Sequence, residues 1–179
     1  TTAPAQPSTP TTYADNAGAT QSPSSTAPST DDTTPSINIG AVPAGTTPTL
    51  LVDGQKVPAT YDPATGTLTP SSPLSEGAHQ ISYALTDAAG NTSAPSAPMS
   101  LTVDSTAPTM AITSNQASLF AGQTATITFT LSEASTDFAW NGSSGDITVT
   151  GGTLSALTQS STNPLVYTAT FTPNANSTT

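Results

Sequence analysis

Gln80-Ile81-Ser82-Tyr83-Ala84-Leu85-Thr86 is the clearest β-strand pattern in the chain. Side chains of a strand alternate between two faces, so Ile81, Tyr83 and Leu85 share one apolar face. An apolar strand face must be buried against a second layer of structure. The segment therefore predicts a β-strand, with these three residues in a core.

Similar short segments extend in both directions from this strand. In the first half the expected strands are Ser36–Gly40, Thr47–Val52, Gln55–Tyr61, Thr65–Thr69, His79–Thr86 and Met99–Val103. Asp53-Gly54 lies between two of them and is typical of a tight hairpin turn. In the second half they are Met110–Thr113, Thr124–Leu131, Asp146–Thr150, Thr153–Leu157 and Val166–Phe171, with Ile127, Phe129 and Leu131 facing inward.

Many short strands with frequent turns predict an all-β fold, because Thr, Ser, Gly and Pro interrupt every window that could hold a helix. The length of 179 residues fits two tandem immunoglobulin-like β-sandwiches. We expect a first domain over 1–104, with an extended Pro/Thr/Ser-rich lead-in over 1–35, and a second over 105–179. The second domain is expected to be incomplete at its C-terminus, leaving an exposed edge near Val166–Phe171.

The charge balance is strongly acidic: eleven Asp and Glu face one Lys and no Arg, giving a net charge of −10. This composition argues against nucleic-acid binding, which needs Lys and Arg for phosphate contacts, and against binding to anionic membranes. No apolar stretch is long enough to insert into a bilayer. With no Cys, neither domain can be stapled by a disulfide, which favours a structural metal ion or packing against neighbouring domains.

Most of the acids fall in expected turns, where oxygen ligands suit Ca²⁺ rather than Zn²⁺ or Cu²⁺. Following strand directions through the first sandwich places Asp31, Asp32, Asp53 and the Asp87–Asn91 loop at one pole. The same reasoning places Asp104 near Glu133 and Asp137 at the junction between domains. Clustered carboxylates repel one another unless a cation is bound. The alternative, that each Asp or Asn only caps its own turn through hydrogen bonds, stays open.

These motifs resemble the bacterial immunoglobulin-like repeats of giant surface adhesins and biofilm-associated proteins. The resemblance rests on Thr30-Asp31-Asp32-Thr33-Thr34-Pro35, Thr86-Asp87-Ala88-Ala89-Gly90-Asn91 and Val103-Asp104-Ser105-Thr106-Ala107-Pro108, and in the second half on Phe129-Thr130-Leu131-Ser132-Glu133. It implies non-catalytic stalk modules on the bacterial cell surface, which contact neighbouring repeats while other regions of the protein bind a host or surface ligand. The metal ligands that it implies for calcium are Asp31, Asp32, Asp87, Asn91, Asp104 and Glu133.

Other functions lack their usual residues. His79 is the only imidazole, so a nucleophile with a positioned base is not expected, and the chain is predicted not to be an enzyme. Trp140 is the only tryptophan, and we expect it to fill a core rather than to stack on a sugar. Two alternatives remain: a glycan- or protein-binding module of a surface protein, and an accessory domain of a secreted hydrolase.

Overall fold

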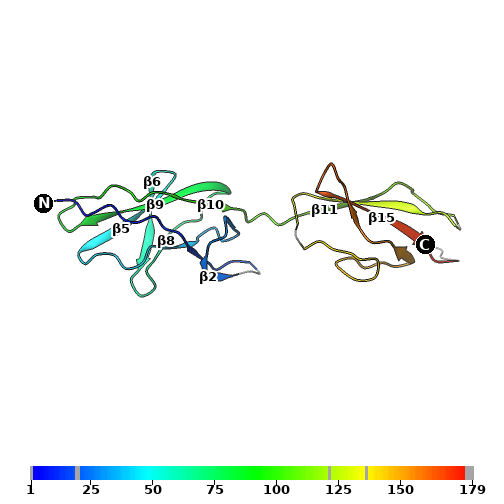
Figure 1. Cartoon of the computed structure of the whole chain (residues 1–179), viewed down its shortest axis with the longest axis horizontal. Coiled ribbons are helices and arrows are strands. Elements are labelled where there is room, and N and C mark those ends of the chain that lie inside the picture. The colour runs from blue at the N-terminus through cyan, green and yellow to red at the C-terminus, as the bar shows by residue number, and fades with distance from the viewer. Residues whose placement is uncertain (1, 19–20, 121, 136, 176–179) are drawn as a thin grey trace. The chain divides into compact units, whose positions relative to one another are not determined.

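The computed structural model describes residues 2–18, 21–120, 122–135 and 137–175. The chain divides into two compact units, unit 1 (Thr1–Thr106) and unit 2 (Ala107–Thr179), and each is treated by itself below. The described residues form strands and no helix (Figure 1), which confirms the all-β prediction. None of them therefore forms an apolar helix of membrane-spanning length.

Unit 1 contains two five-stranded sheets. The first has the order β2 (Ser22–Ser25), β1 (Tyr13–Asp15), β4 (Ser36–Asn38), β8 (Thr67–Pro70), β7 (Ala59–Asp62). The second has the order β3 (Ser29–Thr30), β10 (Met99–Val103), β9 (Gly77–Asp87), β5 (Thr46–Val52), β6 (Gln55–Val57). Neighbouring strands are antiparallel except β3 and β10, which run parallel. The core lies between the sheets, with Tyr13, Ile37 and Leu68 from the first packed against Leu50 and Ile81 from the second.

The strand pattern of β9 is confirmed, since Ile81, Tyr83 and Leu85 are at most 5% exposed. Ser82 and Ala84, on the other face, are 7% and 3% exposed, so this part of β9 is buried on both faces. The Asp53-Gly54 hairpin is also confirmed. It joins β5 to β6, and both of its residues have positive φ, as this tight turn requires.

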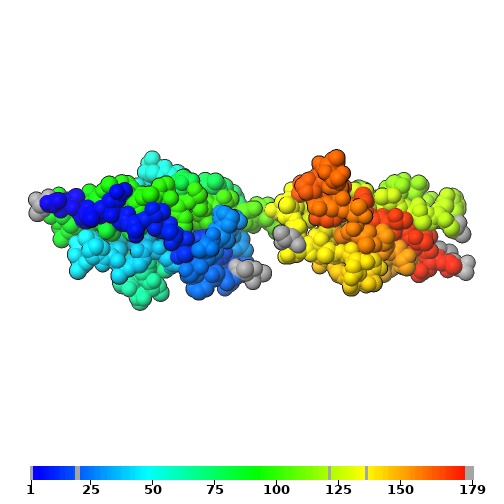
Figure 2. Space-filling view, in the orientation of Figure 1, coloured from blue at the N-terminus to red at the C-terminus, as the bar shows by residue number. Residues whose placement is uncertain are grey.

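Residues 1–35 are more than the expected extended lead-in, because they contribute β1 and β2 to the first sheet and β3 to the second. Tyr13 is 1% exposed, and its hydroxyl lies 2.9 Å from the carbonyl oxygen of Ser29. The preceding residues follow the surface of unit 1 (Figure 2), where the side-chain amide of Gln6 donates to the carbonyl of Pro95. The Ser-, Thr- and Pro-rich composition concealed these strands, since it lacks a regular apolar alternation.

The single strand expected over Gln55–Tyr61 is wrong. Pro58 divides it into β6 and β7, which belong to different sheets. Proline has no backbone N–H to donate to a sheet, so it favours a point at which the chain leaves one sheet for the other.

Unit 2 contains one sheet in the order β11 (Met110–Ser114), β12 (Ala125–Leu131), β15 (Val166–Pro173), β13 (Gly152–Leu154), and β14 (Thr158–Gln159) also pairs with β15. Phe129 and Leu131 are buried and Ile127 is half-buried, which confirms the inward face predicted for β12. Irregular residues 138–149 supply half-buried side chains to this core, among them Phe138 and Trp140.

Two expectations for unit 2 are wrong. Asp146–Thr150 is not a strand, because the segment pairs with no described strand, although Ile147 and Val149 both pack against the core. Val166–Phe171 is not an exposed edge: residues 152–159 fold back onto β15, which pairs with β12 on its other side. A β-strand pattern indicates which side chains face inward but not which strands become neighbours.

Candidate functional site

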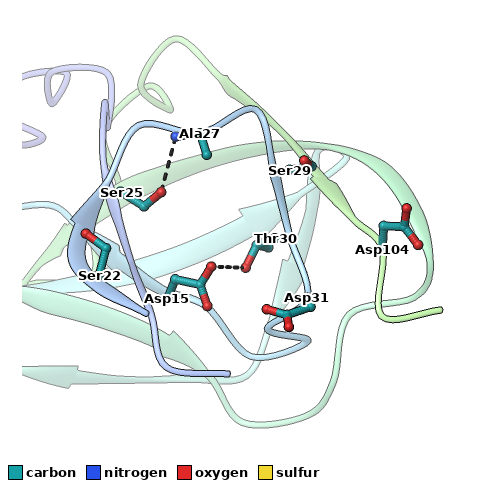
Figure 3. A pocket seen from close by; sticks show the side chains of 8 residues that line it. All are labelled: Asp15, Ser22, Ser25, Ala27, Ser29, Thr30, Asp31 and Asp104. Carbon is teal, nitrogen blue, oxygen red and sulfur yellow. Dashed lines mark hydrogen bonds between the residues drawn. The ribbon is translucent and has the colours of Figure 1, made fainter. Parts of the chain in front are cut away.

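Acidic residues gather at the end of unit 1 where β3 and β10 finish. Thr30 pairs in parallel register with Val103, so the next residues, Asp31 and Asp104, leave the sheet at the same end. The N–H of Asp104 donates to the carbonyl of Thr30 at 2.9 Å. A hollow of about 420 Å³ opens here (Figure 3), and its lining residues are Asp15, Ser22, Ser25, Ala27, Ser29, Thr30, Asp31 and Asp104. We call this region the exit-end acidic site.

Two carboxylates of this end are buried and bonded to protein donors. Asp15 is 8% exposed and accepts a hydrogen bond from the Thr30 hydroxyl at 3.0 Å. Asp32 is 6% exposed and accepts from the N–H groups of Thr34 (2.8 Å) and Asn16 (3.1 Å). The same Thr30 hydroxyl receives the N–H of Asp32, so it links the two acids. Asp15 and Asp32 therefore fasten the end of β1 to the end of β3.

Asp31 and Asp104 are the exposed acids of the exit-end acidic site. The Asp31 carboxylate lies against Gly18, whose missing side chain leaves room for it. In Figure 3 the carboxylate of Asp104 points away from those of Asp15 and Asp31. The N–H of Thr106 approaches Asp104 Oδ1 at 3.4 Å, which is a weak contact. These two side chains retain lone pairs that a cation could use.

The Asp87–Asn91 loop closes on itself at the other end of β9. One carboxylate oxygen of Asp87 accepts the N–H groups of Ala89 (2.9 Å) and Asn91 (2.8 Å), and the other accepts the Asn91 side-chain amide at 2.9 Å. Donation from the Asn91 side chain, followed by the backbone donors, lowers the pKa of Asp87. This geometry is the turn cap that the sequence left open as the alternative to a metal ligand.

The predicted convergence of Asp31, Asp32, Asp53 and Asp87 at one pole is wrong for Asp87 alone. β5 and β9 are antiparallel, with Val52 opposite Ile81 and Thr46 opposite Asp87. Asp53 therefore lies near the start of β9, where Gly77 pairs with Val103, and so at the end that carries Asp31 and Asp104. Asp87 lies at the far end of this eleven-residue strand. The strand-direction argument failed because it left β1 to β3 out of the sheets: β3 runs parallel to β10, so Asp31 and Asp32 lie at the end from which the chain leaves unit 1.

Asp53 has its own partners and is not a candidate ligand. Its Oδ2 lies 2.8 Å from His79 Nδ1, and its Oδ1 accepts the Gln80 N–H at 2.8 Å. The Gln80 N–H contributes most, followed by His79, to lowering the pKa of the Asp53 carboxyl. The Asp53 carboxylate also raises the pKa of His79, with a further contribution from the Ser75 backbone. Sequence reasoning missed this pair, whose residues are 26 positions apart.

No three His, Asp or Glu side chains are grouped as a ready metal site within the described part of the chain. By ligand type, the exit-end acidic site fits a hard cation such as Ca²⁺, because it offers carboxylate and hydroxyl oxygens only. By number, Asp31 and Asp104 fall short of the six to eight oxygens that Ca²⁺ takes. Glu133 is half-buried in the turn after β12 of unit 2, and its predicted partnership with Asp104 stays a prediction.

Trp140 fills the core of unit 2, as expected. It is half-buried among the residues that pack on Phe129 and Leu154, and its indole N–H donates to the carbonyl of Leu154 at 3.3 Å. A sugar platform needs an exposed aromatic face. This placement removes the main sequence feature that favoured glycan binding.

The comparison with protein families agrees with this architecture. A model of the bacterial Ig-like domain matches residues 6–105, more than half of the chain, and a second bacterial Ig-like model matches residues 104–179. The chain therefore belongs to the bacterial Ig-like domain family, as the sequence motifs indicated, and consists of two such domains in tandem. No curated protein matches it.

Proposed function

We propose that these two domains are structural spacer modules of an exported bacterial adhesin, which support cell attachment and biofilm formation and are stiffened by calcium at domain ends. The tandem bacterial Ig-like domains support the spacer role. In this role the units supply reach, while other regions of the protein bind the host or surface ligand. Mechanical stiffness at the ends of each module then matters more than any chemistry.

The observation that carries the calcium part is the parallel pairing of β3 with β10. It brings Asp31 and Asp104 to the end from which the chain leaves unit 1. The chain has no arginine, and its only lysine, Lys56, is exposed on β6. Two carboxylates without a cationic side chain favour binding of a metal ion. Asp31 and Asp104 are the ligands that unit 1 supplies, and water completes the coordination.

Calcium sites of extracellular modules have dissociation constants of about 10⁻⁴–10⁻³ M. Such sites fill outside the cell, where calcium is millimolar, and binding to the folded state raises its stability. Calcium would therefore stiffen the modules after export, at the place where they carry load.

Thermal unfolding of the whole chain in 5 mM CaCl₂ and in EGTA tests the calcium part. We expect a higher midpoint in calcium, and loss of the difference in the Asp31→Asn/Asp104→Asn double variant. Asp62→Asn is the matched control, since Asp62 is an exposed acid whose carboxylate accepts the N–H of Ala64 and the hydroxyl of Thr65 within its own turn. Equal midpoints in calcium and EGTA for the unmodified chain would refute structural calcium.

The spacer role is tested separately by binding. A spacer should give no specific signal on a glycan array or on immobilised matrix proteins, with or without calcium. A saturable interaction that survives competition by an unrelated Ig-like domain would replace the spacer proposal with a binding-module function.

A further inference from the structure

The segment through which the chain leaves unit 1 is held by Glu76, in the loop between β8 and β9. The backbone N–H of Ser105 lies 3.2 Å from both carboxylate oxygens of Glu76, and the Ser105 hydroxyl donates to one of them. Ser105 comes two residues after the last residue of β10. The Glu76 contact therefore sets the direction of residues 104–106.

The same loop is held on its other side by His79, which is 8% exposed. Its Nε2 lies 2.9 Å from the carbonyl oxygen of Ser75, the residue next to Glu76, and its Nδ1 lies 2.8 Å from Asp53 Oδ2. A carbonyl and an ionised carboxylate can only accept hydrogen bonds. Both ring nitrogens must therefore carry a proton for both contacts to form, so this geometry selects the imidazolium. The Ser75 hydroxyl also faces Nε2 but lies farther away, at 3.4 Å, so the carbonyl is the shorter contact.

The surroundings of His79 contain little else that titrates. Asp53 is the charged group that faces the ring from the β5–β6 turn. From β10 the residue opposite His79 is Leu101, and from β6 the exposed Lys56 pairs in register with Leu51. The loop contributes Ser75 to the ring, while its Glu76 is turned to Ser105. The raised pKa of His79 agrees with this arrangement.

We propose that His79 is a proton-dependent brace for the exit segment of unit 1: protonated, it holds Ser75 and keeps Glu76 on Ser105, and deprotonated, it releases the loop and the exit segment becomes mobile. Neutral imidazole has one N–H, so deprotonation leaves one of the two acceptors without a donor. The exit segment, residues 104–106, is therefore held firmly at neutral and mildly acidic pH and loosely under alkaline conditions. This inference does not depend on calcium.

The absence of cysteine makes a direct test possible. A nitroxide attached to Thr106→Cys in the whole chain reports the mobility of the exit segment by electron paramagnetic resonance from pH 5 to 9.5, in EGTA. A label at Ala88→Cys, in the loop at the far end of β9, is the control. NMR titration of the single imidazole gives its midpoint in the same samples.

We expect the label at residue 106 to gain mobility with the same midpoint as the His79 ring, and the label at residue 88 to ignore this transition. His79→Gln should abolish the pH dependence, and Glu76→Gln should weaken it without moving the ring midpoint. Asp53→Asn should lower the pH midpoint of the mobility change at residue 106 and the pH midpoint of the His79 ring by the same amount. This variant keeps the test valid if His79→Gln does not fold. Mobility at residue 106 that stays constant while His79 titrates would overturn the brace.

Discussion

The carboxylate of Asp31 occupies the space beside Gly18 that a side chain at residue 18 would need. Gly18 has a φ of +65° and follows β1, whereas Asp31 follows β3, so the two residues fasten neighbouring turns at the exit end of unit 1. This contact places one of the two candidate calcium ligands. Gly18 cannot bind a metal ion through a side chain, but it belongs to the exit-end acidic site because its missing Cβ leaves room for Asp31.

Gly18→Ala should destabilise unit 1 and displace Asp31. Alanine at positive φ costs about 1 kcal/mol, and the overlap with the carboxylate adds to that. Gly45→Ala is the control, because Gly45 has a φ of +78° with open space around it and so reports the backbone strain alone. Urea unfolding of both variants measures the difference; equal losses would mean that Asp31 does not press on residue 18.

Ile81→Ala should be the more damaging of two matched substitutions in strands. Ile81 is fully buried at the centre of unit 1, so its truncation should lower the free energy of unfolding by about 2–5 kcal/mol. Ile112 in β11 is 62% exposed, and Ile112→Ala should cost about 0.5 kcal/mol or less. Denaturant titration that tracks the units separately checks both values. A large loss for Ile112→Ala would place that side chain in a core.

The Asp53–His79 pair should make the stability of unit 1 depend on pH at both extremes. The folded pKa of His79 is raised, so its contribution is complete below its usual 6.5 and is lost as pH rises through the folded pKa. The folded pKa of Asp53 is lowered, so its contribution is complete above 3.8 and is lost as pH falls through the folded value. Urea midpoints across pH should show a plateau between these limits. In His79→Gln the alkaline decline due to this pair should vanish; a decline of the same size would assign it to another group.

Asn91→Ala should raise the pKa of Asp87, because the Asn91 side chain is the leading cause of its lowering. Carboxyl ¹³C NMR titration measures the change directly. Asp62 is the internal control: its pKa is lowered by its own turn donors, chiefly the N–H of Ala64, and should not respond. An unchanged Asp87 would show that the backbone donors alone hold its carboxylate.

Local pattern predicted most of the strands. Alternation identified β9 and β12 with the correct inward faces, and Asp53-Gly54 identified its hairpin. The strands in residues 1–35 escaped because a buried Tyr13 among Ser, Thr and Pro gives no periodic signal. The position of β15 escaped because periodicity contains no information on which strand pairs with which.

The candidate site was only partly predicted, because strand pairing also decides which acidic residues lie together. Asp104 was placed correctly at the end where the chain leaves unit 1, whereas Asp31 and Asp32 were assigned to the opposite end. Asp87 with Asn91 behaves as a turn cap, which five neighbouring residues suffice to build. Asp15 and Thr30 joined the site only through folding, since β1 and β3 belong to different sheets.

The order of residues alone determined that this chain is all-β, acidic, free of cysteine and able to form strands at nearly fixed places, because these properties depend on composition and on neighbours a few positions apart. Only the tertiary structure decided that Asp31 lies at the end of β10 rather than beside Asp87, and that His79 faces Asp53. Those contacts join segments separated by tens of residues, and their geometry follows from sheet order and register, which no local pattern encodes.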